Sequence, residues 1–346
     1  MKGLVNTDLN QVELREVEKP QLLHAGDAII RITLTTICGS DLHLIHGHMP
    51  TTHGFVVGHE YVGVVEEVGS EVKDFKQGDR VTGPAAPFCG QCERCSSGHI
   101  AQCLRGGIHG SGAEFGDLPG TQSEYIRVPF ADVNLVTVPA ELGDEQVLFV
   151  GDILSTGYFS AEKGEIHPGD SVVIFGAGPV GLCAVHAARL FSPSQIILVD
   201  IESHRLAIGT RMGATSIIRA DQEDVLAVIH SLTGGKGADV AIEAAGVEMA
   251  FQQAVRCVGI GGRVSIVSIY GDDVSLPLPE IFMKNIRIEM GLSYLGNMKR
   301  LIRMIQNGQL DLTPLISHRI KLSEISKGYE MFEKRLDNVI KIAITP

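Results

Sequence analysis

The first part of the chain alternates apolar and polar residues, as half-buried β-strands do. Residues 28–34, AIIRITL, follow this pattern, and strand-like runs recur at 61–68 and 125–128. The Gly-Asp pair at 78–79 indicates a turn between such strands. We therefore predict that the first 150 or so residues form mostly β-structure with loops.

After residue 151 the pattern changes to short apolar runs separated by helical segments. Buried strands are expected at 171–175, 196–199, 240–242 and 264–267, and helices at 180–191 and 203–212. Strands that alternate with helices are typical of a parallel sheet, so the fold class is α/β. Beyond residue 296 we expect helices at 298–307 and 322–336 around a strand at 316–320. A closing strand at 339–344 could pair back with the first β domain.

A glycine-rich sequence, Gly176-Ala177-Gly178-Pro179-Val180-Gly181, fits the pattern of a dinucleotide-binding loop. It follows an expected strand and opens an expected helix, as the motif requires. The three glycines would allow a tight turn, close approach of a pyrophosphate, and close packing of the helix. The helix N-terminus would attract the phosphates. An ordinary glycine-rich turn is the alternative.

Asp200 ends the strand that follows this loop, where an acidic side chain binds the ribose hydroxyls. A carboxylate there repels a 2′-phosphate, which favours NAD over NADP. Arg205 lies close enough in sequence to complicate this preference, and it joins the loop residues as a cofactor-binding candidate.

Four cysteines, Cys89, Cys92, Cys95 and Cys103, lie within one expected loop. Four thiolates in tetrahedral geometry suit zinc, and a site with no open position is structural. An iron–sulfur cluster, two disulfides and a zinc-ribbon nucleic-acid binder are alternatives. The last is disfavoured because 29 basic against 41 acidic residues give a net charge of −12, which repels phosphate backbones.

Cys38, His59 and Asp152 could together bind a second zinc ion. Three protein ligands that leave a fourth position open are the catalytic arrangement. Each residue alone has an ordinary interpretation: a small buried thiol, a residue of a turn, and a helix N-cap.

Several motifs occur together: Cys38-Gly39-Ser40-Asp41-Leu42-His43, Gly58-His59-Glu60, Gly78-Asp79-Arg80-Val81, the four cysteines, and the glycine loop with Asp200. In this combination the whole chain resembles the zinc-containing, medium-chain alcohol dehydrogenase family. The resemblance implies a GroES-like β domain, residues 1–152 and 296–346. It also implies an inserted Rossmann domain that binds NAD, residues 153–295.

The resemblance also implies roles for the site residues. Cys38 and His59 would be catalytic zinc ligands, and Asp152 stands where many members have a second cysteine. That substitution is similar to bacterial secondary-alcohol dehydrogenases and to the formaldehyde dehydrogenase branch. Glu60 would be a carboxylate that exchanges onto the metal, and Asp41 would orient His59.

The resemblance places the proton relay on Ser40, with His43 as its outer member, and implies two zinc ions per subunit. The substrate pocket would be lined near His43, Ala85, Ala86, Phe115 and residues 293–295. Small alanines and the lack of a basic cluster favour a small neutral alcohol, preferably a secondary one, and its ketone. Polyol oxidation, formaldehyde oxidation and a nucleotide-binding protein without turnover are alternatives.

The remaining histidines of this region, His46, His48, His53 and His109, are expected to be loop residues rather than ligands. The start of the chain lacks a signal-peptide core and no stretch suits a membrane span, so we expect a cytoplasmic protein. Its partners would be a small-molecule substrate and, as in the family, further copies of itself. A tetramer is favoured over a dimer.

Overall fold

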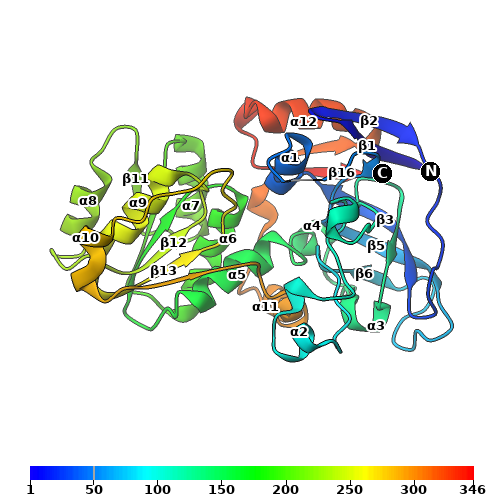
Figure 1. Ribbon diagram of the computed structural model, residues 1–346, viewed down its shortest axis with the longest axis horizontal. Helices are drawn as coiled ribbons and strands as arrows, with labels where there is room; N and C mark the ends of the chain where they lie inside the picture. The colour runs from blue at the N-terminus through cyan, green and yellow to red at the C-terminus, as the bar shows by residue number, and fades with distance from the viewer. Residues whose placement is uncertain (50) are drawn as a thin grey trace. The chain divides into compact units, whose positions relative to one another are not determined.

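The computed structural model describes residues 1–49 and 51–346, and the chain divides into two compact units (Figure 1). The first unit comprises Met1–Ser155 and Tyr294–Pro346, and the second comprises Thr156–Ser293. Both chain ends belong to the first unit, where β16 (Lys341–Thr345) pairs antiparallel with β3 (Ala28–Thr36). The predicted return of the tail to the first β domain is therefore confirmed.

Two sheets form the framework of the first unit in the described residues. The larger has the order β15-β16-β3-β5-β6-β8, with β7 also paired to β3, and the smaller has the order β2-β1-β4. The remaining strands are β1 (Lys2–Asp8), β2 (Gln11–Glu16), β4 (Phe55–Val56), β5 (Tyr61–Val68), β6 (Arg80–Thr82), β7 (Tyr125–Val128), β8 (Val136–Thr137) and β15 (Ile316–Lys321).

Short helices connect these strands. They are α1 (Gly39–Ile45), α2 (Glu93–Ser96), α3 (Ala131–Asn134), α4 (Asp144–Val147), α11 (Met298–Gln306) and α12 (Ile325–Glu333). One apolar core lies between β3, β5 and β7 and includes Ile30, Tyr61 and Ile126. A second core joins the N-terminal strands to the C-terminal segment through Ile37 and Ile342. The tail is thus part of the unit that carries the start of the chain.

The second unit is built on a parallel sheet of order β11-β10-β9-β12-β13-β14. Its strands are β9 (Ser171–Phe175), β10 (Gln195–Asp200), β11 (Ser216–Arg219), β12 (Ala238–Glu243), β13 (Val258–Ile266) and β14 (Arg287–Met290). From β9 the strands are added in chain order toward β11 on one side, and from β12 toward β14 on the other. The position between β9 and β12, where the direction of winding reverses, is the switch point of the sheet. Ligands of such sheets bind at the carboxyl ends of the strands at that point.

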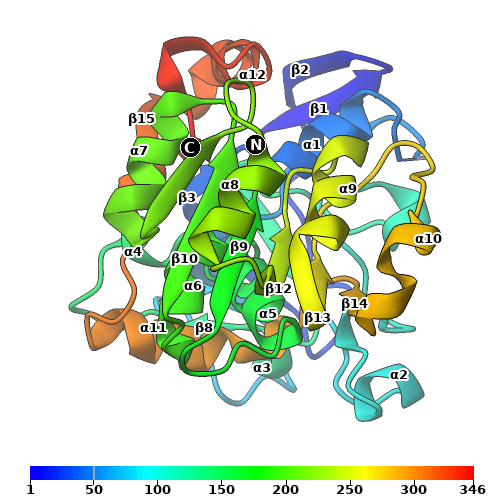
Figure 2. The ribbon, with the colours of Figure 1, turned by 90° about the vertical axis from the view of Figure 1, so that its left-hand side faces the viewer.

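Helices cover both faces of this sheet. They are α5 (Ile153–Lys163), which begins just before the unit, α6 (Pro179–Ala188), α7 (Ser203–Met212), α8 (Val225–Leu232), α9 (Glu248–Cys257) and α10 (Leu278–Ile281). Figure 2 shows α6 and α7 near β10, and α9 near β12 and β13. Residues 171–175 are buried throughout because neither face of the sheet meets solvent, and this explains the continuous apolar run.

Some boundaries differ from those expected. The helix expected at 180–191 ends as α6 at Ala188 and continues as a 3₁₀ turn, and the helix expected at 322–336 is regular only over α12. Helices α1, α8 and α9 were not among the expected elements, and α5 was foreseen only through the interpretation of Asp152 as a helix N-cap. The mixed α/β class is confirmed. Among the described residues, no helix is long and apolar enough to cross a membrane.

Candidate metal centres and cofactor loop

The first candidate metal centre lies where β3 ends and α1 begins. The N–H of Cys38 donates to Asp41 Oδ2 at 2.9 Å, a capping contact that closes the turn into α1. His59 and Glu60 directly precede β5, and Asp152 directly precedes α5. Each of Cys38, His59, Glu60 and Asp152 offers one ligand atom, and these atoms lie within 4.8 Å of one another. The structure therefore brings the predicted ligands together.

The chemistry of these side chains fits a zinc ion. Asp152 Oδ2 lies 3.3 Å from His59 Nε2 and 3.5 Å from Cys38 Sγ. A thiolate, an imidazole nitrogen and a carboxylate oxygen are all ligands that zinc accepts. Burial alone would lower the pKa of His59, but the carboxylates of Asp41 and Asp152 raise it well above its usual value. This concentration of negative charge around a buried nitrogen favours a bound cation.

Asp41 lies beside the His59 ring, on the side away from the other ligands. His59 Nδ1 lies 3.1 Å from Asp41 Oδ1, which leaves Nε2 directed toward the other ligands. Asp41 Oδ2 also accepts from the Gln122 side chain at 2.9 Å, and Gln122 accepts from the Tyr329 hydroxyl at 2.8 Å. Gln122 and Tyr329 were not predicted, because no local motif marks residues so distant along the chain.

Glu60 is engaged by a buried lysine of the C-terminal strand. Lys341 and Glu60 are 0% and 1% exposed, form an ion pair, and Lys341 Nζ also donates to the carbonyl of Ile37 at 2.9 Å. Burial raises the pKa of Glu60 to about 7, although Lys341 opposes this shift. Exchange of Glu60 onto a metal stays a prediction. Lys341 was missed, although a lysine within the apolar run 339–344 was an available signal.

The proposed relay residues lie one helical turn apart on α1. Ser40 Oγ is 3.2 Å from His59 Nε2, while His43 Nδ1 is 3.2 Å from His48 Nδ1. Burial, followed by the neighbouring His48 and His46, lowers the pKa of His43. His43 is therefore neutral at pH 7, the form that accepts a proton.

The second candidate centre is the group of four cysteines. Sulfur–sulfur distances are 3.4 Å for Cys92–Cys95, 3.8 Å for Cys92–Cys103 and 4.0 Å for Cys89–Cys95. Ligands about 2.3 Å from one tetrahedral zinc lie roughly 3.8 Å apart. A disulfide requires about 2.05 Å, and all four thiols are free, so the two-disulfide alternative is wrong.

Backbone N–H groups favour the thiolate form of Cys89, whereas burial raises the pKa of Cys95 to about 12. Burial raises the pKa of Cys89, but the N–H groups of Gln91 and Cys92 outweigh it, and the pKa falls to about 6. The Cys92 N–H lies 3.3 Å from Cys89 Sγ. The lobe therefore fits a single closed metal site.

The glycine loop follows β9 and leads into α6. Gly176 has φ +94°, and a Cβ there would lie 3.0 Å from the backbone of Ala244. A Cβ at Gly181 would lie 1.8 Å from the carbonyl oxygen of Gly176, whereas one at Gly178 would meet nothing within 4 Å. Gly176 therefore fits a tight turn and Gly181 fits close packing of the helix. Gly178 leaves open space on the side where a pyrophosphate is expected. Pro179 and Val180 begin α6.

Asp200 ends β10 beside this loop. Its Oδ2 accepts the N–H of Ala177 at 2.5 Å and its Oδ1 accepts the N–H of Glu202 at 2.8 Å. Arg205 is the third residue of α7, and its side chain is half-buried. The carboxylate is thus held at the carboxyl edge of the sheet, where a ribose is expected.

The structure also places the predicted pocket residues and the remaining histidines. Ala85 and Ala86 pack with Leu295 in the apolar cluster beside the cysteine lobe, and Phe115 is half-buried. His46 pairs with Glu333 at 3.0 Å, and His53 lies 3.8 Å from Asp8. His109 is buried and its Nδ1 lies 2.8 Å from the carbonyl oxygen of Pro119.

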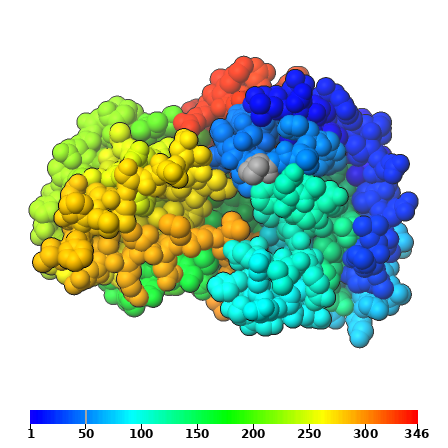
Figure 3. All heavy atoms as spheres, in the orientation of Figure 1, coloured from blue at the N-terminus to red at the C-terminus, as the bar shows by residue number. Residues whose placement is uncertain are grey.

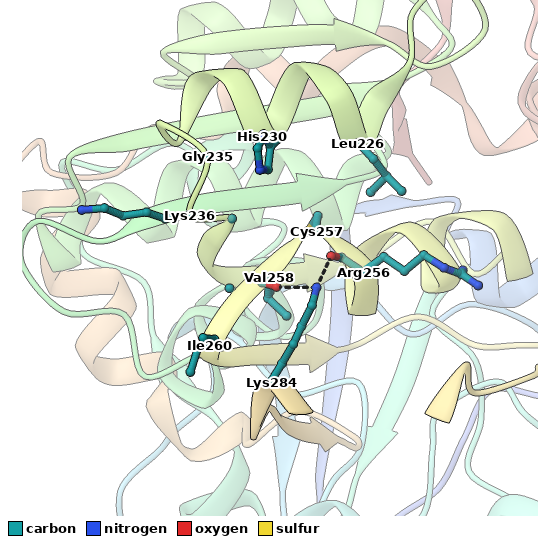
Figure 4. Close-up of a pocket in the computed structure, with 11 residues that line it drawn as sticks. Leu226, His230, Gly235, Lys236, Arg256, Cys257, Val258, Ile260 and Lys284 are labelled. Atoms are coloured by element: carbon teal, nitrogen blue, oxygen red, sulfur yellow. Dashed lines mark hydrogen bonds between the residues drawn. The ribbon is translucent and has the colours of Figure 1, made fainter. Parts of the chain in front are cut away.

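A hollow of about 280 Å³ lies at the opposite edge of the parallel sheet (Figure 4). It is lined by residues of α8, the loop 235–237, the end of α9, the start of β13 and Lys284. Lys284 Nζ donates to the carbonyls of Arg256 and Val258 at 2.7 and 3.0 Å, and burial raises the pKa of Cys257 to about 12. The Lys284 ammonium is therefore engaged by backbone carbonyls, and burial favours the neutral thiol of Cys257.

Comparison with known proteins agrees with both units. Residues 24–140 match the alcohol dehydrogenase GroES-like domain, and residues 179–307 match the zinc-binding dehydrogenase domain. An alcohol dehydrogenase of Cupriavidus necator is 39% identical over the whole chain and 99% of its own length. The chain belongs to the zinc-containing medium-chain alcohol dehydrogenase family.

Solved members of this family share the fold. Alcohol dehydrogenase TADH from Thermus sp. ATN1 is 38% identical with a TM-score of 0.94, covering 100% of this chain and 99% of its own. A zinc-dependent alcohol dehydrogenase 2 from Streptococcus pneumonia is 37% identical with a TM-score of 0.93, covering 100% and 98%. This alcohol dehydrogenase is therefore an oxidoreductase that uses zinc and a nicotinamide cofactor, with a GroES-like domain and a Rossmann domain.

Proposed function

We propose that this alcohol dehydrogenase oxidises a small neutral secondary alcohol to its ketone with NAD. The observation that supports this most is the convergence of Cys38, His59 and Asp152 ligand atoms within 4.8 Å. Such a set leaves a coordination position for the alcohol oxygen. The residue limits of the domains, 1–152 with 296–346 and 153–295, belong to the same proposal.

When bound, zinc supplies Lewis acidity to the alcohol oxygen, and the nicotinamide supplies the hydride acceptor. The chain's own residues position and move the proton. Asp41 holds His59 in its ligating orientation. The Ser40 hydroxyl, 3.2 Å from His59 Nε2, would accept the proton of the alcohol as its own proton passes to neutral His43 and on to solvent.

A second zinc ion, structural in role, is proposed for the cysteine lobe, which gives two zinc ions per subunit. The near-tetrahedral sulfur spacing and the lowered pKa of Cys89 support this count. A site with four thiolates has no open position and takes no part in turnover. Seven free cysteines agree with a reducing compartment and with the cytoplasmic location proposed.

The preference for NAD rests on Asp200, whose carboxylate would repel a 2′-phosphate. Solved relatives include one from Sinorhizobium meliloti bound to NADP and one from E. coli CFT073 complexed with NADH, at 26% and 25% identity. Kinetics with both cofactors are therefore the direct test. A higher kcat/KM with NADP would contradict the proposal.

Substrate choice is proposed from chemistry and from relatives. An L-threonine 3-dehydrogenase of Colwellia psychrerythraea, 32% identical over 92% of this chain, and a 2R,3R-butanediol dehydrogenase of Bacillus subtilis, 26% identical, carry names of secondary-alcohol substrates. Polyols and formaldehyde are the alternative substrates. A screen of NAD reduction over secondary alcohols, primary alcohols, polyols and formaldehyde separates these possibilities.

The expected result is the highest kcat/KM for a short secondary alcohol. Preference for a polyol or formaldehyde would replace the substrate and keep the chemistry. No turnover with any compound, in protein loaded with zinc, would favour a nucleotide-binding protein without catalysis.

A homo-oligomer, with a tetramer favoured, is also proposed. The edge of the parallel sheet at β14 and the turn before it expose Phe282, Met283 and Met290 to 76%, 79% and 72%. This segment is coloured orange in Figure 3. Exposed apolar side chains beside an unprotected sheet edge favour contact with another copy. Sedimentation that shows only monomers would contradict this.

A further inference from the structure

Glu243 is a buried carboxylate at the carboxyl end of β12, and neither the glycine loop nor the metal centre includes it. Its side chain is 0% exposed. Oε1 accepts the backbone N–H groups of Ala245 and Gly246 at 2.8 and 3.0 Å. Oε2 forms hydrogen bonds with the hydroxyls of Ser268 and Tyr270. A carboxylate has the four acceptor positions that these donors require.

These four donors belong to two loops that leave adjacent strands. Ala245 and Gly246 follow β12, while Ser268 and Tyr270 follow β13, and both strands end at the carboxyl edge of the sheet. A Cβ at Gly246 would lie 2.7 Å from the carbonyl oxygen of Ile269, so the two loops touch. Glu243 therefore joins the two loops through one side chain.

The first of these loops also packs against the dinucleotide loop. The N–H of Ala244 donates to the carbonyl of Phe175 at 2.9 Å. A Cβ at Gly176 would lie 3.0 Å from the backbone of both Ala244 and Ala245. The loops joined by Glu243 thus form the β12 and β13 side of the switch point, opposite Asp200 on β10.

A dinucleotide at a switch point spans both sides of it. With its adenosine ribose at Asp200, its nicotinamide half extends over the ends of β12 and β13. We propose that Glu243 is a positioning residue, which holds these two loops in the shape that receives the nicotinamide half of the cofactor. This inference rests on the proposed dinucleotide site.

The test compares a whole dinucleotide with its adenosine half. Binding of NADH and of AMP to the zinc-loaded protein is measured by calorimetry for the wild type, Glu243→Ala and Glu243→Gln. For Glu243→Ala we expect the Kd of NADH to rise about tenfold, as for loss of a charge-assisted hydrogen bond, and the Kd of AMP to stay unchanged. Glu243→Gln restores NADH affinity, since its amide can accept from the two N–H groups and donate to the two hydroxyls.

Asp239→Asn is the matched control. Asp239 lies near the other end of the same strand, where it accepts from the N–H and the hydroxyl of Ser171 at 2.8 and 2.7 Å. It should change neither affinity. If Glu243→Ala does not fold, Tyr270→Phe and Ser268→Ala remove single donors and should each weaken NADH binding without affecting AMP.

Equal weakening of NADH and AMP, or unchanged NADH affinity in Glu243→Ala or in both donor variants, would overturn the inference. A wild-type protein that binds neither NADH nor AMP would instead contradict the proposed dinucleotide site.

Discussion

Asp200 illustrates how one side chain can serve both the fold and cofactor choice. Its carboxylate accepts backbone N–H groups from Ala177 and Glu202, which fixes it beside the glycine loop. The same negative charge would face a ribose, where it accepts hydroxyls and repels a phosphate. We therefore propose that cofactor preference depends on this residue more directly than on the loop glycines.

Replacing Asp200 with glycine should relax the preference for NAD. We expect the ratio of kcat/KM for NAD to that for NADP to fall about tenfold or more, equivalent to roughly 1.4 kcal/mol, because the repulsive charge is removed. Steady-state kinetics with both cofactors measure the ratio. Glu202→Gln, in the same turn, is the control, and an equal change there would mean that the effect is general charge.

Because His109 is buried, we expect the free energy of unfolding to depend on pH. Burial lowers its pKa to about 3 in the folded protein, against a usual value of 6.5. A group with a lowered folded pKa stabilises the fold fully above pH 6.5 and loses that contribution as the pH falls toward 3. Between pH 7 and pH 5, the wild type should lose about 2 kcal/mol more unfolding free energy than His109→Gln.

Denaturant unfolding at the two pH values measures this difference. Zinc ligands also protonate at low pH, but they are common to both proteins and cancel in the comparison. Parallel pH profiles for the wild type and His109→Gln would show that His109 is not the group responsible.

Some site residues could be predicted from the sequence, and others could not. Cys38, His59 and the four cysteines lie in local motifs, so their convergence could be predicted from spacing and resemblance. Lys341, Gln122 and Tyr329 contact the same centre from distant parts of the chain. Such contacts depend on tertiary packing, which local patterns do not encode.

Among the elements, the C-terminal strand β16 completes the first unit and supplies the buried Lys341. This residue forms an ion pair with buried Glu60. A buried charge that loses its partner is strongly destabilising, whereas loss of both charges is tolerated. The strand thus connects the end of the chain to the metal centre.

The variant Lys341→Met should lower the unfolding free energy by about 3 kcal/mol or more. The double variant Lys341→Met with Glu60→Gln should recover part of this loss, since no unpaired charge remains. Thermal and denaturant unfolding measure both effects. Lys321→Met, on the exposed part of neighbouring β15, is the control, and a double variant no more stable than the single one would contradict the explanation.

Strands could be predicted from the sequence where complete burial makes every residue apolar. The strands at 171–175 and 196–199 read as apolar runs because both faces of the parallel sheet are covered. Helix α1 was not expected, since its start depends on the contact of Asp41 with the Cys38 N–H. Short helices fixed by a single capping contact carry too little periodicity to be recognised.

At the scale of the whole molecule, each of the two units carries its own part of the chemistry. The first contains both candidate metal centres, and the second contains the glycine loop and Asp200. The split of the first unit into an N-terminal and a C-terminal segment was implied by the family resemblance, and the pairing of β16 with β3 agrees with it. The net charge of −12 agrees with a small-molecule rather than a nucleic-acid partner.

We propose that Cys38, His59 and Asp152 hold the zinc ion that serves alcohol oxidation. The most direct test of this proposal is zinc content per subunit by elemental analysis, with NAD reduction by a secondary alcohol on the same samples, for the wild type and Cys38→Ser. We predict two zinc ions with turnover in the wild type, one for each candidate centre. Cys38→Ser should retain the structural zinc ion and NAD binding without turnover. Unchanged zinc content and turnover in Cys38→Ser would show that Cys38 does not bind a catalytic zinc ion.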